Sequence, residues 1–159
     1  MICKVEMRID ASLHSAPRLC DGGIGLFSSM SMAKGQVLVN FNPVERITQP
    51  TRYSIQIDET EHLALCADID SYINHSCDAN TYVAFPSLYL HALRDIRSGE
   101  ELTINYCSTE EDLLESFECL CEAKDCYGRV RGFKYLDNEQ RKKLIVNLAP
   151  YLKRKYHVD

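Results

Sequence analysis

Seven consecutive residues near the middle of the chain, Asn74 to Asn80, combine side chains that bind ligands and metals. They read Asn-His-Ser-Cys-Asp-Ala-Asn, and the stretches on either side are apolar enough to form strands. A second group of ligating side chains follows at Cys119, Cys121 and Cys126, spaced C-x-C-x4-C. Three thiolates this close can chelate one zinc ion, but a structural tetrahedral site needs four ligands. The two segments together predict one structural zinc site.

Cys77 is the fourth ligand that we favour, because it already lies in the polar central segment. Cys107 and Cys66 are alternatives that spacing alone leaves open. The competing interpretation is that these cysteines are free thiols in a loop. Closely spaced cysteines beside charged residues are poorly suited to a hydrophobic core, which favours metal binding. The first ten residues contain no apolar signal-peptide segment. We therefore expect an intracellular protein, cytoplasmic or nuclear, in which closely spaced cysteines bind metal more readily than they form disulfides.

Length and composition are those of one globular domain. The chain has 159 residues, of which 45% are hydrophobic and 26% charged, and no apolar run approaches the ~20 residues that span a bilayer. Its net charge of −5 is unevenly distributed, because residues 129–159 hold nine of the eighteen basic residues and only three of the twenty-three acidic ones. An acidic body can attract a basic substrate, and the basic tail can touch an acidic partner or simply be a solvated helix.

Short segments of alternating or apolar pattern must position these side chains. Such segments predict an edge strand at residues 4–9 and further strands at 36–41, 53–58, 62–66, 82–85, 88–93 and 101–106. A glycine-rich turn at residues 22–25 precedes the apolar pair Leu26-Phe27. One clear helix follows Asp137, a capping residue with Gln140 three positions later, and should stop at Pro150. The pattern favours a mainly β domain with few helices.

Five motifs occur in a recognisable order: G-I-G-L-F from residue 23, K-G-Q-V-L from 34, Y-I-N-H-S-C-D-A-N from 72, G-E-E-L-T-I-N-Y from 99 and C-x-C-x4-C-Y-G from 119. Together they resemble the SET-domain methyltransferases, and the cysteine tail resembles their post-SET zinc module. The resemblance implies a SET-domain (β-clip-like) fold of short strands with a C-terminal pseudoknot. It further implies a SET domain over residues 1–115, a post-SET zinc-binding segment over 116–135, and a C-terminal helix and basic tail over 136–159.

The resemblance also implies residue roles. The backbone of the glycine-rich turn would lie against S-adenosyl-L-methionine, with Asn74 and His75 holding its amino-acid and adenine parts, and Asn80 would serve turn structure. Tyr106 would lie beside the transferred methyl group as the catalytic residue. The remaining implied sets are the turn itself (Gly23, Ile24, Gly25, Leu26), the substrate channel (Phe41, Tyr53, Ile104) and the ligands of one Zn²⁺ (Cys77, Cys119, Cys121, Cys126).

Methyl transfer from a sulfonium is an in-line displacement, in which positioning donor and acceptor supplies most of the rate. A lysine acceptor, with an ordinary pKa of about 10.4, must first lose a proton, and a nearby sulfonium charge and desolvation both lower that pKa. Tyr106 fits this reaction better as a positioning hydroxyl than as a strong base.

Two departures from the family pattern concern the acceptor. Phe41 stands where many lysine-methylating relatives have a tyrosine, and Ile104 stands where phenylalanine or tyrosine is usual. A carboxylate acceptor would need fewer oxygens to align it than an amine. We therefore expect a protein-lysine methyltransferase, with a small-molecule carboxylate as the alternative acceptor and a non-catalytic zinc-stapled binding module as the third possibility. We expect no membrane and no direct nucleic-acid binding, and a homodimer is plausible.

Overall fold

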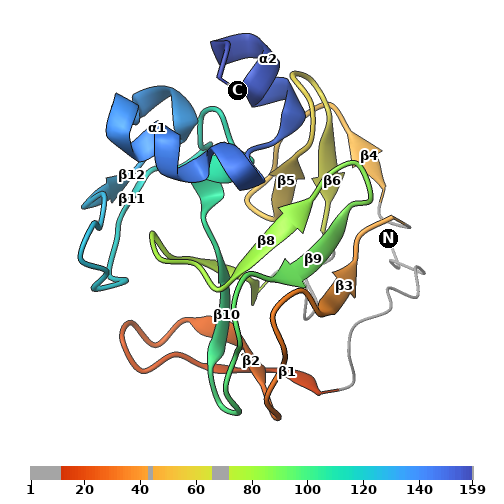
Figure 1. Cartoon of the computed structure of the whole chain (residues 1–159), viewed down its shortest axis with the longest axis vertical. Coiled ribbons are helices and arrows are strands. Elements are labelled where there is room, and N and C mark those ends of the chain that lie inside the picture. Colours follow the sequence, from red (N-terminus) through yellow and green to blue (C-terminus); the bar gives the residue numbers. More distant parts are fainter. Residues whose placement is uncertain (1–11, 43–44, 66–71, 159) are drawn as a thin grey trace.

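The computed structural model describes residues 12–42, 45–65 and 72–158, shown in Figure 1. The strand predicted at residues 4–9 and the alternative ligand Cys66 lie outside these ranges. Short strands in four sheets dominate the described residues. They are β1 (Leu13–Pro17), β2 (Ile24–Ser28), β3 (Val37–Asn40), β4 (Arg46–Ile47), β5 (Ser54–Gln56), β6 (His62–Ala64), β7 (Asn74–His75), β8 (Thr81–Ala84), β9 (Tyr89–Ala92), β10 (Glu101–Ile104), β11 (Phe117–Glu118) and β12 (Arg129–Val130). The mainly β prediction is thus confirmed.

One sheet, with the strand order β1-β2-β10-β7, brings distant motifs together. Strand β2 follows the glycine-rich turn and lies antiparallel to both β1 and β10. Strand β7 lies parallel to β10, with Asn74 opposite Thr103 and His75 opposite Ile104. The glycine turn, the Asn-His pair and the strand that leads to Tyr106 therefore meet in one place. Sequence patterns predict strands, but they do not predict this parallel pairing.

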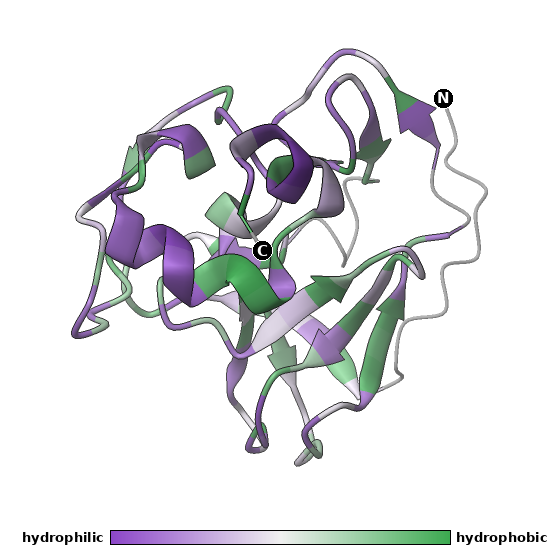
Figure 2. Ribbon diagram, turned by 45° about the horizontal axis from the view of Figure 1, so that its top comes forward, coloured by the Kyte–Doolittle hydropathy of each residue, from purple (hydrophilic) through white to green (hydrophobic). Residues whose placement is uncertain are grey.

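The other three sheets have the orders β3-β9-β8, β4-β6-β5 and β11-β12. The main core lies between the sheets, where Leu26, Leu90 and Leu102 are fully buried. Burial alternates along β9 and β10, as expected for strands with one face in a core. In Figure 2 the strands carry much of the hydrophobic colour and the helices much of the hydrophilic colour.

The C-terminal part begins with the 3₁₀ turn η3 (Phe133–Tyr135) and the helix α1 (Asn138–Leu144), and continues with η4 (Ile145–Asn147) and α2 (Pro150–Tyr156). The predicted capping box is present: the Asp137 side chain accepts from the Gln140 backbone, and the Gln140 side chain accepts from the Asp137 backbone. Pro150 follows the end of the first helical stretch, as predicted, but it also begins α2. A first helical residue needs no backbone N–H donor, so proline suits that position.

A second, smaller core holds this part of the chain together; its buried members are Phe133, Leu148, Ala149, Tyr151 and Leu152. The Tyr151 hydroxyl donates to the Thr109 carbonyl at 2.5 Å, which joins α2 to the segment after Tyr106. No helix in the described part of the chain has the length and apolar character needed to cross a bilayer.

Basic side chains of the tail pair with acidic groups of the same chain. Lys143 lies 2.7 Å from Asp125, Arg154 lies 3.0 Å from Asp58, and Lys155 lies 2.8 Å from Glu111. Each pair is solvent-exposed on at least one side and contributes about 0–1 kcal/mol to stability. Some of the basic charges of the C-terminal tail are thus neutralised by acidic residues of the same chain.

Gly132 should be the most sensitive glycine to substitution. It has a φ of +118°, and an added Cβ would lie 2.4 Å from the Glu111 carbonyl oxygen. We expect Gly132→Ala to destabilise the fold by about 3 kcal/mol, or roughly 6–12 °C in Tm by calorimetry. Gly35→Ala is the control, because φ is also positive there (+82°) but the space around it is open. Equal losses in the two variants would contradict the steric argument.

Candidate functional site

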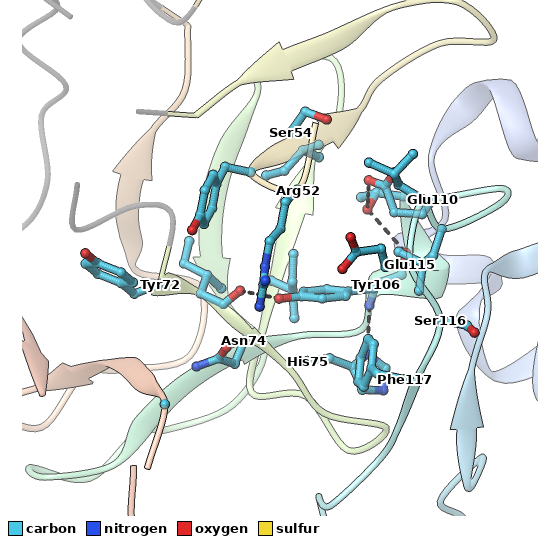
Figure 3. Close-up of a pocket in the computed structure, with 18 of the residues that line it drawn as sticks. Arg52, Ser54, Tyr72, Asn74, His75, Tyr106, Glu110, Glu115, Ser116 and Phe117 are labelled. Atoms are coloured by element: carbon cyan, nitrogen blue, oxygen red, sulfur yellow. Dashed lines mark hydrogen bonds between the residues drawn. The ribbon is translucent and has the colours of Figure 1, made fainter. Parts of the chain in front are cut away.

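A cavity of about 540 Å³ opens beside Tyr106 (Figure 3). Its lining comes from the turn before β2, the segment entering β5, Leu65 after β6, the segment that runs into β7, and the stretch from the end of β10 to the cysteine cluster. Gly23, Ile24, Asn74 and His75 all line it, as the sequence comparison with SET domains implies for a cofactor pocket. Leu26 is instead fully buried in the core under the turn.

Asn74 anchors one wall of the cavity. Its amide nitrogen donates to the Ile24 carbonyl at 2.8 Å and to a Glu101 carboxylate oxygen at 2.9 Å. The same oxygen lies 2.9 Å from Nε of Arg18. A Cβ at position 25 would approach this oxygen to 2.6 Å and would shift the carboxylate that orients Asn74.

Sequence reasoning missed Arg18 and Glu101, although Glu101 lies inside a motif that it singled out. It also expected Asn80 to serve turn structure. Asn80 is in fact 2% exposed and bridges to β10: its side-chain oxygen accepts from the Thr103 backbone at 2.9 Å, and its nitrogen donates to the Glu101 carbonyl at 2.8 Å. The central motif is thereby tied to the strand that ends near Tyr106.

His75 connects the backbone of Tyr106 to Cys77. The Tyr106 backbone N–H donates to Nδ1 of His75 at 3.1 Å, which fixes the proton of a neutral ring on Nε2. Nε2 lies 3.3 Å from Sγ of Cys77, so the ring donates to that sulfur. Burial lowers the pKa of His75 to about 4, and the ring is therefore neutral at physiological pH. The neutral ring thus gives the Cys77 sulfur a hydrogen-bond donor, while burial raises the pKa of that thiol.

Tyr106 begins the 3₁₀ turn η2 (Tyr106–Ser108) directly after Asn105, whose side chain caps it. The Tyr106 hydroxyl donates to the Ile73 carbonyl at 2.9 Å, and its ring packs edge-on against His75 and Phe117. Burial raises the pKa of Tyr106 to about 12. The hydroxyl is therefore protonated and held in position, which suits alignment of a reacting group better than proton abstraction.

Four thiols converge next to this cavity. The sulfurs of Cys77, Cys119, Cys121 and Cys126 lie within 4.8 Å of one another. A zinc ion with four sulfur ligands at about 2.3 Å holds them about 3.8 Å apart, and the sulfurs of Cys77 and Cys119 are separated by 3.8 Å. Backbone N–H groups of Tyr127 and Gly128 donate to two of the sulfurs, an arrangement that stabilises thiolates. The residues fit a structural Zn²⁺.

Cys107, the alternative ligand, is fully buried outside the cluster. Its position outside the cluster separates it from the four ligands; burial raises the pKa of the Cys107 thiol and of the Cys77 and Cys119 thiols alike. Of the implied substrate channel, Tyr53 and Ile104 line the cavity. Phe41 instead is fully buried in the main core and is not among the described residues that line the cavity.

Glu110 is a further cavity residue that sequence patterns gave no reason to single out. One of its carboxylate oxygens accepts from the Gln56 backbone at 2.7 Å and from the Thr109 hydroxyl at 3.2 Å. Burial raises the pKa of Glu110 to about 7, because these hydrogen bonds do not offset the loss of water.

A carboxyl group whose pKa is raised on folding destabilises the folded state as pH rises from its unfolded pKa, near 4.5, through its folded pKa, near 7. Glu110→Gln removes that cost and keeps an oxygen for Gln56 and Thr109. We expect the variant to match the wild type near pH 4.5 and to be more stable by about 2 kcal/mol at pH 8.5, or roughly 4–8 °C in Tm. Thermal unfolding at both pH values measures this; a variant less stable at pH 8.5 would contradict it.

Comparison with known proteins gives the family. The SET domain model matches residues 23–107, more than half of the chain. The methyltransferase flvH of Aspergillus flavus is 32% identical over 84 residues, which are 52% of this chain and 47% of that protein. The human histone-lysine N-methyltransferase SMYD3 is 43% identical over 63 residues, 36% of this chain and 15% of that protein. The chain therefore spans less than half the length of these curated relatives.

Two solved structures have a similar fold. The complex described as KRYPTONITE with mCHG DNA and SAH has a TM-score of 0.60 at 20% identity, covering 77% of this chain and 29% of that one. SUVH6 of Arabidopsis thaliana, solved with SAM, has a TM-score of 0.63 at 16% identity, covering 76% of this chain and 33% of that one. On the family match over residues 23–107 and this shared fold, the chain belongs to the SET-domain family.

Proposed function

We propose that the protein is an S-adenosyl-L-methionine-dependent methyltransferase that acts on a protein lysine. The observation that carries the proposal is the parallel pairing of β7 with β10, which sets Asn74 and His75 beside Tyr106 on one cavity. Relatives named as methyltransferases support the reaction type, and the two structural neighbours were solved with the methyl donor or its product.

In this proposal the donor lies along Gly23, Ile24 and Asn74, with its adenine near His75 and Phe117. The Tyr106 hydroxyl, fixed by the Ile73 carbonyl, narrows the passage between donor and acceptor. Such a channel aligns the acceptor nitrogen behind the methyl group, which is the main contribution that a protein can make to an in-line displacement. Tyr53 and Ile104 belong to the acceptor side; Phe41 would act only from the core behind it.

Zn²⁺ held by the four clustered cysteines supplies structure to this site. It would fix Phe117 and the segment up to Cys126 against the central motif, because Cys77 comes from that motif and the other three ligands come from the segment. This supports a post-SET role for residues 116–135, after a SET domain of residues 1–115. Residues 136–159 would then buttress that segment through the second core, which includes Phe133.

A lysine acceptor is favoured by the charges of the cavity, whose lining includes more acidic than basic side chains: Asp21, Glu110, Asp112, Glu115 and Glu118 against Arg18 and Arg52. Relatives named as histone-lysine N-methyltransferases point the same way. The second candidate acceptor is a small-molecule carboxylate. Arg52 extends beside Tyr106, where its guanidinium could pair with such a carboxylate (Figure 3).

The test incubates zinc-loaded protein and methyl-labelled donor with core histones, cell-extract proteins and a set of short carboxylic acids. Label in protein bands that resists hydroxylamine, and that amino-acid analysis places on lysine, is the expected result. Label confined to a base-labile, organic-soluble product would select the carboxylate instead. Absence of S-adenosylmethionine binding by calorimetry would overturn both methyltransferase readings and leave a zinc-stapled binding module.

A further inference from the structure

Glu110 is a buried carboxylate that lowers the stability of the folded state at neutral and higher pH. It has no role in the donor site proposed above. It lines the cavity that contains Tyr106, on the far side of the tyrosine ring from Arg52 (Figure 3). Its backbone N–H donates to the Tyr106 carbonyl at 2.8 Å, so the two residues are rigidly connected. Buried carboxylates that lower stability are often retained because they meet a ligand.

Only one oxygen of the Glu110 carboxylate has hydrogen-bond donors among the described residues. Oε1 receives both the Gln56 backbone N–H and the Thr109 hydroxyl. Oε2 receives none in that part of the chain, and the side chain faces the cavity. The group is thus held in place by one oxygen and presents the other, which is the arrangement expected of an acceptor for a donor that enters from outside.

Within residues 12–42, 45–65 and 72–158, no salt bridge gives Glu110 a cation partner. Arg18, on the opposite wall, is already engaged by Asp21 at 2.5 Å and by Glu101 at 2.9 Å. Arg52 lies toward the hydroxyl end of Tyr106 (Figure 3). On the wall that contains Glu110 the other charged lining residues are acidic, namely Asp112, Glu115 and Glu118, and all three are exposed.

We propose that Glu110 is a specificity-determining residue that binds the cationic amine of the acceptor through Oε2 and thereby selects an ammonium side chain over a carboxylate. The inference deepens the proposed function, on which it rests for the identity of the cavity. An ammonium group offers three donors and a full positive charge, and it is the chemical complement of a desolvated carboxylate with one free oxygen. It would also lower the pKa of Glu110 from about 7, so that binding restores the ionised form.

Glu115 is the nearest competitor for this role, since Figure 3 shows its carboxylate beside the Tyr106 ring. Glu115 is exposed, whereas Glu110 is set deeper in the wall and held by two donors. An exposed carboxylate attracts cations weakly and in a salt-dependent way, but a desolvated one forms the stronger, shorter contact. Cation binding by Glu110 should therefore be stronger than binding by Glu115 and less sensitive to salt.

The test uses n-butylammonium, which copies the end of a lysine side chain, and butyrate, which copies a carboxylate acceptor. Each is titrated into zinc-loaded protein saturated with S-adenosylhomocysteine, and binding is followed by NMR chemical shifts at pH 8 and at two salt concentrations. The proteins are the wild type, Glu110→Gln, Glu115→Gln and Glu139→Gln. The last is a control on α1 with the same charge change, 79% exposed and paired with Lys142.

We expect n-butylammonium to bind the wild type in preference to butyrate, and Glu110→Gln to weaken it at least tenfold at both salt concentrations. Glu115→Gln should weaken it less than threefold and only at low salt, and Glu139→Gln should leave it unchanged. Equal binding by Glu110→Gln and the wild type, an equal loss in Glu115→Gln, preference for butyrate, or no binding of n-butylammonium up to 100 mM would each overturn the assignment.

This experiment does not depend on finding the natural acceptor. If no protein becomes labelled in the methyl-transfer test but n-butylammonium binds through Glu110, protein lysine is wrong as the substrate while the amine specificity holds. If protein lysine is labelled and Glu110→Gln has unchanged affinity for n-butylammonium, the methyltransferase proposal stands and the role of Glu110 is refuted. A cofactor affinity unchanged in Glu110→Gln shows that the loss belongs to the acceptor side.

Discussion

We expect the wild type to bind about one zinc ion per chain and Cys77→Ser to lose it. Three thiolates and a hydroxyl make a far weaker site, and we expect at least a 100-fold loss in zinc affinity. The same change removes the sulfur to which His75 donates at 3.3 Å, so S-adenosylmethionine binding should weaken as well. Metal content after dialysis against a weak chelator, together with calorimetry for the cofactor, measures both effects.

Cys107→Ser is the matched control, because Cys107 is fully buried but lies outside the four-thiol cluster. It should retain a full ion, although burying a hydroxyl in place of the thiol will lower its Tm. Cys121→Ser should behave like Cys77→Ser. A full zinc ion in Cys77→Ser, or its loss in Cys107→Ser, would show that the fourth ligand is not the one that the geometry indicates.

Tyr106→Phe is the second change with a large expected effect, and it bears on the proposed methyl transfer. The ring contacts with His75 and Phe117 survive, but the hydroxyl that donates to the Ile73 carbonyl is lost. We expect kcat to fall by roughly 100-fold or more while the Kd for S-adenosylmethionine changes less than threefold, because the hydroxyl acts on alignment in the transition state. Single-turnover rates and calorimetry separate the two quantities.

Tyr135→Phe controls for the loss of a tyrosine hydroxyl elsewhere, since Tyr135 is 44% exposed on η3. Its kcat should equal that of the wild type. Equal activity in Tyr106→Phe would remove Tyr106 from the catalytic machinery, and a parallel loss of cofactor affinity would assign it to donor binding instead.

The strands were predictable where the side chains alternate in hydropathy or form short apolar runs. The strands predicted at residues 88–93 and 101–106 contain the shorter β9 and β10, each with one face buried, whereas Tyr106 begins η2. The start of α1 was predictable from Asp137 and Gln140 because a capping box is a local interaction. The start of α2 at Pro150 was not, since proline is compatible both with the end of one helix and with the beginning of another.

The candidate site was predictable in part. Residue types and their spacing can be recognised in the sequence, but the pairing of distant strands that gives other residues a place in the site cannot. Asn74, His75 and the cysteines stand out by type and spacing. Glu101 and Glu110 look like ordinary acidic residues until β7 pairs with β10 and Gln56 reaches Glu110. Phe41 was expected in the channel from its motif position, but its side chain is fully buried in the main core. Such orientations depend on tertiary packing that a single sequence does not encode locally.

The order in which the cavity walls occur along the chain has a consequence for synthesis. Part of its lining is made by the end of β10, but Tyr106, Glu110, Phe117 and three of the four clustered thiols follow later, the last of them at Cys126. Chains are made at about 5–20 residues per second and fold progressively as they emerge. For about 1–4 seconds a nascent chain therefore has an incomplete cavity lining and only one of the four clustered thiols, Cys77. The proposed zinc site therefore gains its last ligand only when Cys126 has been made, after the whole cavity lining has been synthesised.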